Sequence, residues 1–177
     1  HNINDQQFEQ ISSIQKDIQR LKHLNQRITI LTKIENNRFI RVVAVNITKL
    51  LEEKIENFKD MEIDYISLHS KKDLLVSMDF YLADILINNL ISNAIKHSSE
   101  EKNISINVEN NTLIISNYGQ NALKHPERLF LRFYREANSM KSTGLGLAIV
   151  KKICDLYKFE IAYNFVGQQH IFSVFFK

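Results

Sequence analysis

Residues 85–98 read ILINNLISNAIKHS, and the rest of the chain is best understood outward from this stretch. Its apolar residues recur at helical spacing from Asp79 onward, which predicts a helix over residues 79–97 with Asp79 as the N-cap. Four polar residues interrupt the helix at spacings of three and four: Asn89, Asn93, Lys96 and His97. That spacing places them on one face.

The residue types on this face suit a bound polyanion. Asn89 and Asn93 carry neutral carbonyl oxygens, which are hard ligands appropriate for Mg²⁺. Lys96 adds a mobile cation for phosphate oxygens. The alternative is an amphipathic helix whose amides are solvated, because the whole sequence is rich in asparagine.

A second segment, residues 142–150 (STGLGLAIV), runs from small residues straight into a predicted helix over 145–157. Gly144 and Gly146 would let phosphate approach backbone N–H groups at the helix N-terminus, where the helix dipole favours an anion. A tight turn from loop to helix is the plain alternative. Two of the chain's 4 glycines lie here, and Gly119 opens the long loop that precedes them.

The N-terminal part predicts one long helix. Apolar residues from Phe8 to Ile34 recur in steps of three and four, which places them on one narrow stripe of a helix of about thirty residues. Such a stripe needs a partner helix, and a coiled-coil spacer is the simplest interpretation.

The intervening pattern alternates between strands and helices, and it predicts an α+β domain from about residue 38. Asn110 and Asn111 predict a tight hairpin turn. The predicted strands are 39–45, 62–68, 74–78, 103–109, 112–116, 159–166 and 170–176, the further predicted helix is 47–60, and 118–143 is a long loop.

Composition narrows the functional class. With 44% hydrophobic and 24% charged residues the chain is globular, and its net charge of +3 is scattered, which gives no indication of nucleic-acid binding. The apolar runs are shorter than a membrane span, and the N-terminal residues do not resemble a secretory signal. The lone Cys154 fits a reducing compartment and a buried helix face. We expect an intracellular, soluble piece.

Three motifs in the right order resemble the sensor histidine kinases of two-component systems. Residues 85–98 look like the N box of their ATP-binding domain, a domain shared with gyrase and MutL. Residues 129–135 (LFLRFYR) are similar to the F box, and residues 142–153 to the second glycine box. Residues 18–36 resemble the second helix of the family's dimerisation and histidine-phosphotransfer hairpin.

The resemblance implies a two-layer fold, in which three helices cover one face of a mixed, mostly antiparallel sheet and a long helix precedes them. Residues 1–37 would be part of the hairpin and residues 38–177 the catalytic domain. The implied function is to bind Mg²⁺ and ATP and transfer the γ-phosphate to a histidine for relay to a response regulator. The parent would be a homodimer anchored in the bacterial inner membrane, with this part cytoplasmic.

The motifs also imply roles for individual residues. Asn89 and Asn93 would hold Mg²⁺ and the phosphates. Phe130 and Phe133 would anchor the lid in the core. The remaining residues implied to bind ATP are Lys96, His97, Asn117, Gly119, the lid cations Arg132, Arg135 and Lys141, and the loop residues Thr143, Gly144, Leu145, Gly146 and Leu147.

The first glycine box departs from the family pattern. Where the family has an Asp that accepts a hydrogen bond from the adenine amino group, this chain has Asn117, followed by Gly119. The amide keeps a carbonyl acceptor but loses the charge, which is worth roughly 1 kcal/mol. We therefore expect weakened but surviving adenine recognition.

The phosphoacceptor is the other departure. His1 and His23 lack the family's sequence context, so we expect a fragment without the first hairpin helix, which binds ATP but does not phosphorylate itself. The competing hypothesis is a degenerate pseudokinase, a regulatory module that binds nucleotide poorly and acts through its long helix as a dimerisation or partner surface.

Overall fold

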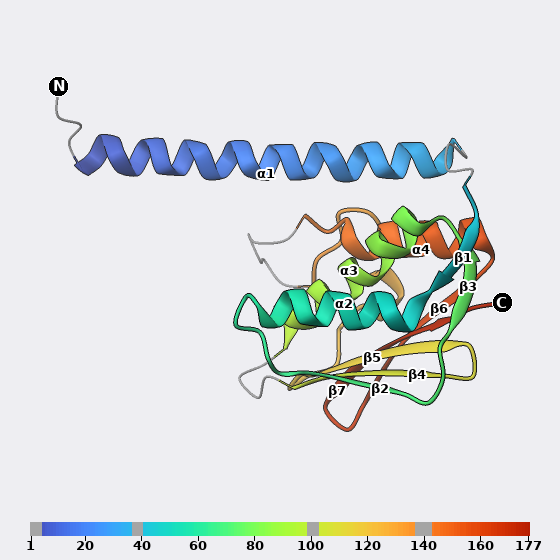
Figure 1. Cartoon of the computed structure of the whole chain (residues 1–177). Coiled ribbons are helices and arrows are strands. Elements are labelled where there is room, and N and C mark those ends of the chain that lie inside the picture. Colours follow the sequence, from blue (N-terminus) through green and yellow to red (C-terminus); the bar gives the residue numbers. More distant parts are fainter. Residues whose placement is uncertain (1–4, 37–40, 99–102, 137–142) are drawn as a thin grey trace.

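The computed structural model describes residues 5–36, 41–98, 103–136 and 143–177. It shows a long N-terminal helix lying along one side of a two-layer α+β domain (Figure 1). Within these ranges, the helices are too short or too polar to cross a lipid bilayer.

The domain is built on a five-stranded sheet. The strand order is β2-β4-β5-β7-β6, in which β2 and β4 are parallel and every other pair is antiparallel. The bounds are β2 Ile66–Ser70, β4 Ile104–Glu109, β5 Thr112–Tyr118, β6 Glu160–Val166 and β7 Gln169–Phe175. A separate antiparallel ribbon joins β1 (Val43–Asn46) to β3 (Leu75–Met78).

Three helices lie on one side of this sheet, as Figure 1 shows. They are α2 (Ile47–Lys59), α3 (Phe80–His97) and α4 (Gly146–Tyr157), and a short 3-10 helix, η1 (Pro126–Arg128), lies in the loop before α4. The three helices and the sheet enclose one apolar core, in which α3 contributes the longest set of buried side chains. This arrangement confirms the predicted fold class.

Local sequence signals account for the start of α3 and for the turn between β4 and β5. Asp79 caps α3 as predicted, because its Oδ1 accepts from the backbone N–H of Tyr81 and Leu82. Asn110 and Asn111 both have positive φ angles, 46° and 59°, as a two-residue hairpin turn requires.

The prediction for the strand at 62–68 was wrong at its start. Residues following α2 continue its last turn, since Ile63 N–H donates to the carbonyl of Phe58, and Glu62 takes a left-handed φ of 63°. The strand therefore begins only at Ile66. Of the strand predicted at 39–45, residues 39 and 40 lie outside the described ranges, and β1 begins at Val43.

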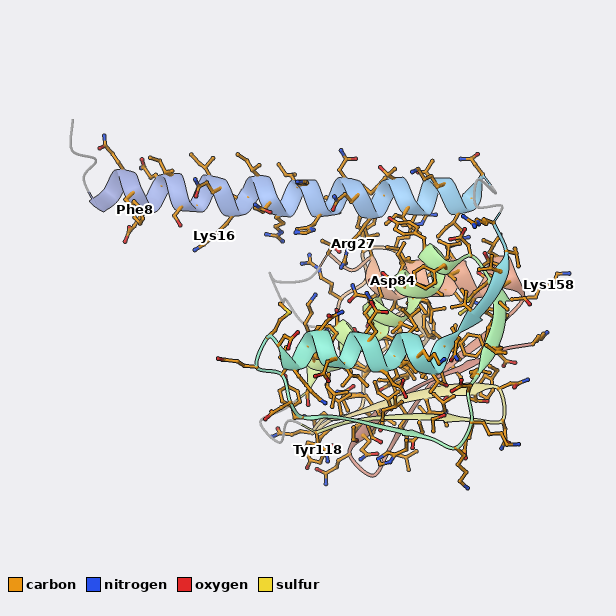
Figure 2. The ribbon with its side chains drawn as sticks, in the orientation of Figure 1. Phe8, Lys16, Arg27, Asp84, Tyr118 and Lys158 are labelled. Atoms are coloured by element: carbon orange, nitrogen blue, oxygen red, sulfur yellow. The ribbon has the colours of Figure 1, made fainter. Side chains whose placement is uncertain are left out.

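Helix α1 (Asp5–Glu35) does not carry the single stripe that its spacing predicts. Leu31 and Ile34 are each 3% exposed and pack in the core, whereas Phe8, Ile18 and Leu21 remain at least 59% exposed. A seven-residue apolar repeat drifts by about 20° per heptad around a straight helix. The stripe therefore leaves the face that contacts α4, and the N-terminal part of α1 extends beyond the domain (Figures 1 and 2).

Candidate functional site

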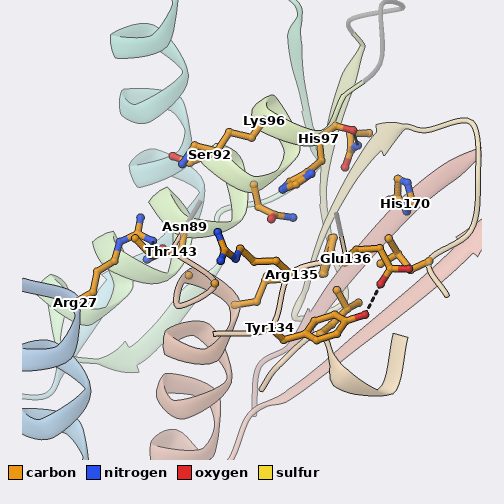
Figure 3. A pocket seen from close by; sticks show the side chains of 18 residues that line it. Arg27, Asn89, Ser92, Lys96, His97, Tyr134, Arg135, Glu136, Thr143 and His170 are labelled. Carbon is orange, nitrogen blue, oxygen red and sulfur yellow. Dashed lines mark hydrogen bonds between the residues drawn. The ribbon is translucent and has the colours of Figure 1, made fainter. Parts of the chain in front are cut away.

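A cavity of about 300 Å³ opens between α3, the N-terminus of α4 and the edge of the sheet, which is within the size range of small-ligand sites. Side chains far apart in the sequence line it (Figure 3). They are Arg27, Asn89, Ser92, Asn93, Lys96, His97, Asn117, Leu123, Leu129, Tyr134, Arg135, Glu136, Thr143, Gly144, Gly146, Leu147, His170 and Phe172.

Asn89 is held in one orientation by its own helix. Its Nδ2 donates to the carbonyl of Ile85 at 2.8 Å, so its Oδ1 points away from the α3 backbone. A Cβ atom at Gly146 would lie 2.9 Å from that oxygen. The glycine therefore lets the first turn of α4 approach a fixed carbonyl acceptor on α3.

Lys96 and His97 end α3 at the rim of the cavity. Desolvation lowers the pKa of Lys96, and the nearby Arg27 guanidinium lowers it further. Desolvation likewise lowers the pKa of His97, with a smaller contribution from Lys96. The end of α3 thus presents a cation beside an imidazole that favours its neutral form.

Asn117, on β5, has an unsatisfied buried acceptor. The residue is 1% exposed, and its Nδ2 donates to the backbone carbonyls of His97 at 3.2 Å and Tyr118 at 3.4 Å. Because a carbonyl accepts but does not donate, these two contacts fix which end of the amide is the nitrogen. Its Oδ1 has no partner among the described residues.

His170, on β7, lies directly across the ladder from Asn117 and lines the same cavity. Its Nδ1 lies 2.7 Å from the Tyr163 hydroxyl, which fixes the ring. Its Nε2 would lie 2.2 Å from a Cβ at Gly119. Gly119 is therefore needed for space rather than for an unusual φ angle, and its own atoms do not line the cavity.

The second glycine loop is shaped by the segment that follows η1. Gly144 has a φ of 66°, and its carbonyl accepts from the N–H of Phe133 at 2.8 Å. A Cβ at Gly144 would lie within 2.8 Å of the Phe133 backbone and of the Tyr134 carbonyl. Glycine is therefore required here both by the positive φ angle and by the close approach of the backbone of Phe133 and Tyr134.

The N-terminus of α4 faces the cavity through Gly146 and Leu147. Its N-cap residue, Leu145, makes no side-chain capping hydrogen bond among the described residues. Its first backbone N–H groups therefore have no intrahelical acceptor, and together with the helix dipole they favour an anion.

Two arginines of the predicted lid are placed differently. Arg135 lines the cavity and points toward its middle in Figure 3. Arg132 instead forms an ion pair with Glu35 at the end of α1, to which Lys152 also comes within 3.9 Å. The third predicted lid cation, Lys141, lies outside the described residues.

Ten of the predicted site residues therefore line one cavity. Of the other four, Lys141 lies outside the described residues, Arg132 and Gly119 do not line it, and Leu145 is fully buried in the core. Phe130 packs against the core as predicted, but the prediction for Phe133 was wrong, because it is 59% exposed. Its left-handed φ of 63° turns the chain toward Gly144.

Sequence reasoning missed several lining residues, above all Arg27 and His170. Arg27 precedes the buried Leu31 and Ile34 by four and seven residues, a spacing that would have shown that it faces the domain. His170 had no local signal, because only the pairing of β5 with β7 brings it to Asn117.

The cavity fits a nucleotide with Mg²⁺. At one end of the cavity, the buried Asn117 Oδ1 can accept a hydrogen bond. At the other end, the backbone of Gly144 and Gly146 lies near the cations Arg27 and Lys96. The Asn89 Oδ1 is a hard oxygen ligand. Within the described ranges no group of three or more His, Cys, Asp and Glu residues forms a metal site, and Mg²⁺ bound with phosphates needs only one or two protein oxygens.

The sequence profile described as "Histidine kinase-, DNA gyrase B-, and HSP90-like ATPase" matches residues 81–177. Sensor histidine kinase HprS of Escherichia coli is 28% identical over 174 residues, which covers 90% of this chain and 37% of that protein. Sensor protein kinase PmrB of Pseudomonas aeruginosa is 27% identical over 155 residues, covering 81% and 32%. The chain thus spans about a third of these relatives' length.

Solved structures share the fold. Histidine kinase AdeS of Acinetobacter baumannii superposes with a TM-score of 0.74 at 23% identity, covering 98% of this chain and 85% of that chain. Full-length ShkA, solved in complex with AMPPNP, gives a TM-score of 0.75 at 17% identity, covering 98% and 39%.

Proposed function

The chain belongs to the histidine kinase-, DNA gyrase B- and HSP90-like ATPase family, and we propose that it is the ATP-binding catalytic part of a sensor histidine kinase. In this role it would bind Mg²⁺ and ATP, and the γ-phosphate would pass to a histidine outside this chain for relay to a response regulator. The curated relatives bear the names of sensor kinases, which supports this choice among the family's branches.

The observation that carries the proposal is the Asn117 amide. Its nitrogen is fixed by two carbonyls, so its buried Oδ1 can only accept. The adenine amino group is a donor of the right kind, and a buried acceptor without a partner costs about 1–3 kcal/mol until it finds one. Adenine at this end would satisfy it.

The opposite end of the cavity suits the phosphates. Figure 3 shows Arg27 and Thr143 on the side away from His170. There the uncapped α4 N-terminus, the glycine backbone and Lys96 converge. Asn89 and Asn93, on the adjoining face of α3, would hold Mg²⁺ through their carbonyl oxygens.

Bound Mg²⁺ and ATP supply the transferable phosphoryl group, and the chain's residues do the positioning. Phosphoryl transfer depends mainly on orientation and charge stabilisation, so no covalent nucleophile is needed. Arg135 would stabilise charge on the phosphates. Cys154 takes no part, because burial raises the pKa of its thiol to about 12.

Helix α1 supports the placement of this part in a larger kinase. Its exposed apolar residues between Phe8 and Leu21 have no partner element in the described structure. We propose that residues 1–37 contribute one helix of a dimerisation and phosphotransfer hairpin, that residues 38–177 are the catalytic domain, and that the parent is a membrane-anchored homodimer with this part in the cytoplasm.

The direct test is calorimetric titration with ADP and a non-hydrolysable ATP analogue, with and without Mg²⁺. Micromolar binding that strengthens with Mg²⁺ is the expected result. A folded chain that binds neither ligand would instead favour the regulatory module, a hypothesis supported by the neutral Asn117 and by the pairing of Arg132 with Glu35 outside the cavity.

A further inference from the structure

Of the described residues of helix α1, Arg27 is the one that lines the cavity. It lies on the face of α1 that packs against α4, four residues before the buried Leu31. Its Nη1 donates to the Thr143 Oγ1 at 2.8 Å, across 116 residues of sequence. Figure 3 shows the guanidinium reaching from α1 to the loop before α4.

Arg27 and Lys96 are two positive charges close to each other. Burial lowers the pKa of its guanidinium, and the charge of Arg27 in turn lowers the pKa of Lys96. Neither cation is paired with a carboxylate among the described residues. Two like charges that share a partly desolvated space are unfavourable unless an anion joins them.

The geometry shows where an anion would bind beside Arg27. A Cβ at Gly146 would lie 3.9 Å from the Arg27 Nη1, so the guanidinium adjoins the uncapped first turn of α4. A planar guanidinium can donate two parallel hydrogen bonds to a phosphate. Its one described bond, to Thr143, leaves other N–H groups for that purpose.

We propose that Arg27 is a phosphate ligand of the nucleotide site, supplied by helix α1 rather than by the ATP-binding domain itself. This rests on the proposed function. The site is then shared between two parts of the chain, and binding of the polyphosphate and docking of α1 stabilise each other, because such coupling is reciprocal. A nucleoside without phosphates does not take part in this coupling.

The test uses the full chain and titrates AMPPNP with Mg²⁺, ADP and adenosine against four proteins. Arg27→Gln is expected to weaken AMPPNP binding at least about tenfold while leaving adenosine binding unchanged, since a charged hydrogen bond is lost. Arg27→Lys keeps the charge but loses the planar guanidinium with its two parallel donors, so a smaller loss of AMPPNP affinity is expected. The matched control is Lys22→Gln, which removes an exposed cation of the same helix that lines neither this cavity nor the adjoining hollow beside Arg27 and Thr143, and it should behave as wild type.

A purely structural role for Arg27, bracing the loop through Thr143, is distinguished by Thr143→Val. That variant removes the hydrogen-bond acceptor and leaves the guanidinium in place. If Arg27 contacts phosphate, Arg27→Gln lowers AMPPNP affinity more than Thr143→Val does. Adding Arg27→Gln to the Thr143→Val variant then lowers the affinity further. Equal losses that do not add would overturn the proposal.

The outcomes separate this proposal from the one it rests on. Wild-type protein that binds no nucleotide contradicts the proposed function. Wild-type binding that Arg27→Gln leaves unchanged contradicts only the role of Arg27. A parallel fall in adenosine and AMPPNP affinity also contradicts it, because a phosphate ligand should not affect the nucleoside.

Discussion

Asn117 on β5 and His170 on β7 are direct partners in the antiparallel ladder, and both line the cavity between α3 and α4. Residues opposite each other on neighbouring strands point to the same face of a sheet. One residue thus presents a fixed amide acceptor and the other a ring held by Tyr163. This pair forms the end of the cavity at which a nucleobase would be recognised.

The first prediction concerns base discrimination. Inosine nucleotides carry a carbonyl oxygen where adenine has its amino group, and that oxygen would face the Asn117 Oδ1. We expect ADP to bind at least about tenfold more tightly than IDP, and Asn117→Ala to weaken ADP by about three- to tenfold while removing most of the preference. Calorimetric titration of both nucleotides measures the ratio, and an unaltered ratio in the variant would contradict the assignment.

The second prediction compares two glycines with similar backbone angles. Gly144 and Gly167 have φ angles of 66° and 57°, but a Cβ at Gly167 meets nothing within 4 Å, whereas one at Gly144 meets the backbone of Phe133 at 2.7 Å. Gly167→Ala is expected to cost about 1–2 kcal/mol of unfolding free energy from conformation alone.

Gly144→Ala should cost more than Gly167→Ala and should also weaken nucleotide binding, because the loop beside Thr143 must move. Urea denaturation and titration of ADP on both variants check this pair. Equal destabilisation of the two would show that the contact between Gly144 and Phe133 does not hold the loop.

The third prediction concerns pH. Desolvation lowers the pKa of His170, and the charge of His97 lowers it further. In the unfolded chain His170 has its ordinary pKa of about 6.5, so below that pH the unfolded state binds more protons than the folded state. The folded state is therefore favoured above pH 6.5, and this contribution is lost as the pH falls toward the lowered folded pKa.

Replacing the imidazole isolates this effect. His170→Gln should flatten the dependence of unfolding free energy on pH between about pH 7.5 and 5.5, relative to wild type. Urea denaturation at several pH values provides the measurement, and His69→Gln, at an exposed position on β2, is the matched control. A slope that changes equally in both variants would argue against a special role of the cavity.

The fourth prediction concerns the apolar residues of α1. Ile18 is 59% exposed and belongs to the set that continues from Phe8 to Leu21. We expect the chain to self-associate through this set, and Ile18→Glu to shift it toward monomer, because a charge in an apolar helix interface is costly. Sedimentation velocity measures this, with Gln19→Glu as the control. A wild-type chain that is fully monomeric with an intact helix would contradict the prediction.

The elements that sequence predicted well are those with local causes. The Asp79 cap, the Asn110–Asn111 turn and the periodicity of α3 each lie within a few residues of the structure they determine. The prediction that Asn89 and Asn93 share one face of α3 has the same local cause, because helical spacing alone brings both side chains to the cavity.

What sequence did not predict depends on contacts distant in the chain. The position of His170 follows from strand order, and the site of Arg27 follows from the packing of α1 on α4. Arg132 was expected near the phosphates from its motif, but Glu35, 97 residues away, is its partner in this structure. Such pairings are set by the whole fold rather than by spacing.

The anchoring of α1 at one end has a mechanical consequence. Leu31, Ile34 and Glu35 fix its C-terminal turns to the domain, while the turns around Phe8 lie free of it. At 1.5 Å per residue, Arg27 lies about 12 Å and Phe8 about 40 Å along the helix from Glu35, so a rigid rotation about Glu35 displaces Phe8 further than Arg27. A pivot that moves Arg27 by one ångström moves Phe8 by roughly three, which amplifies a small rearrangement at the cavity into a large displacement at the far end.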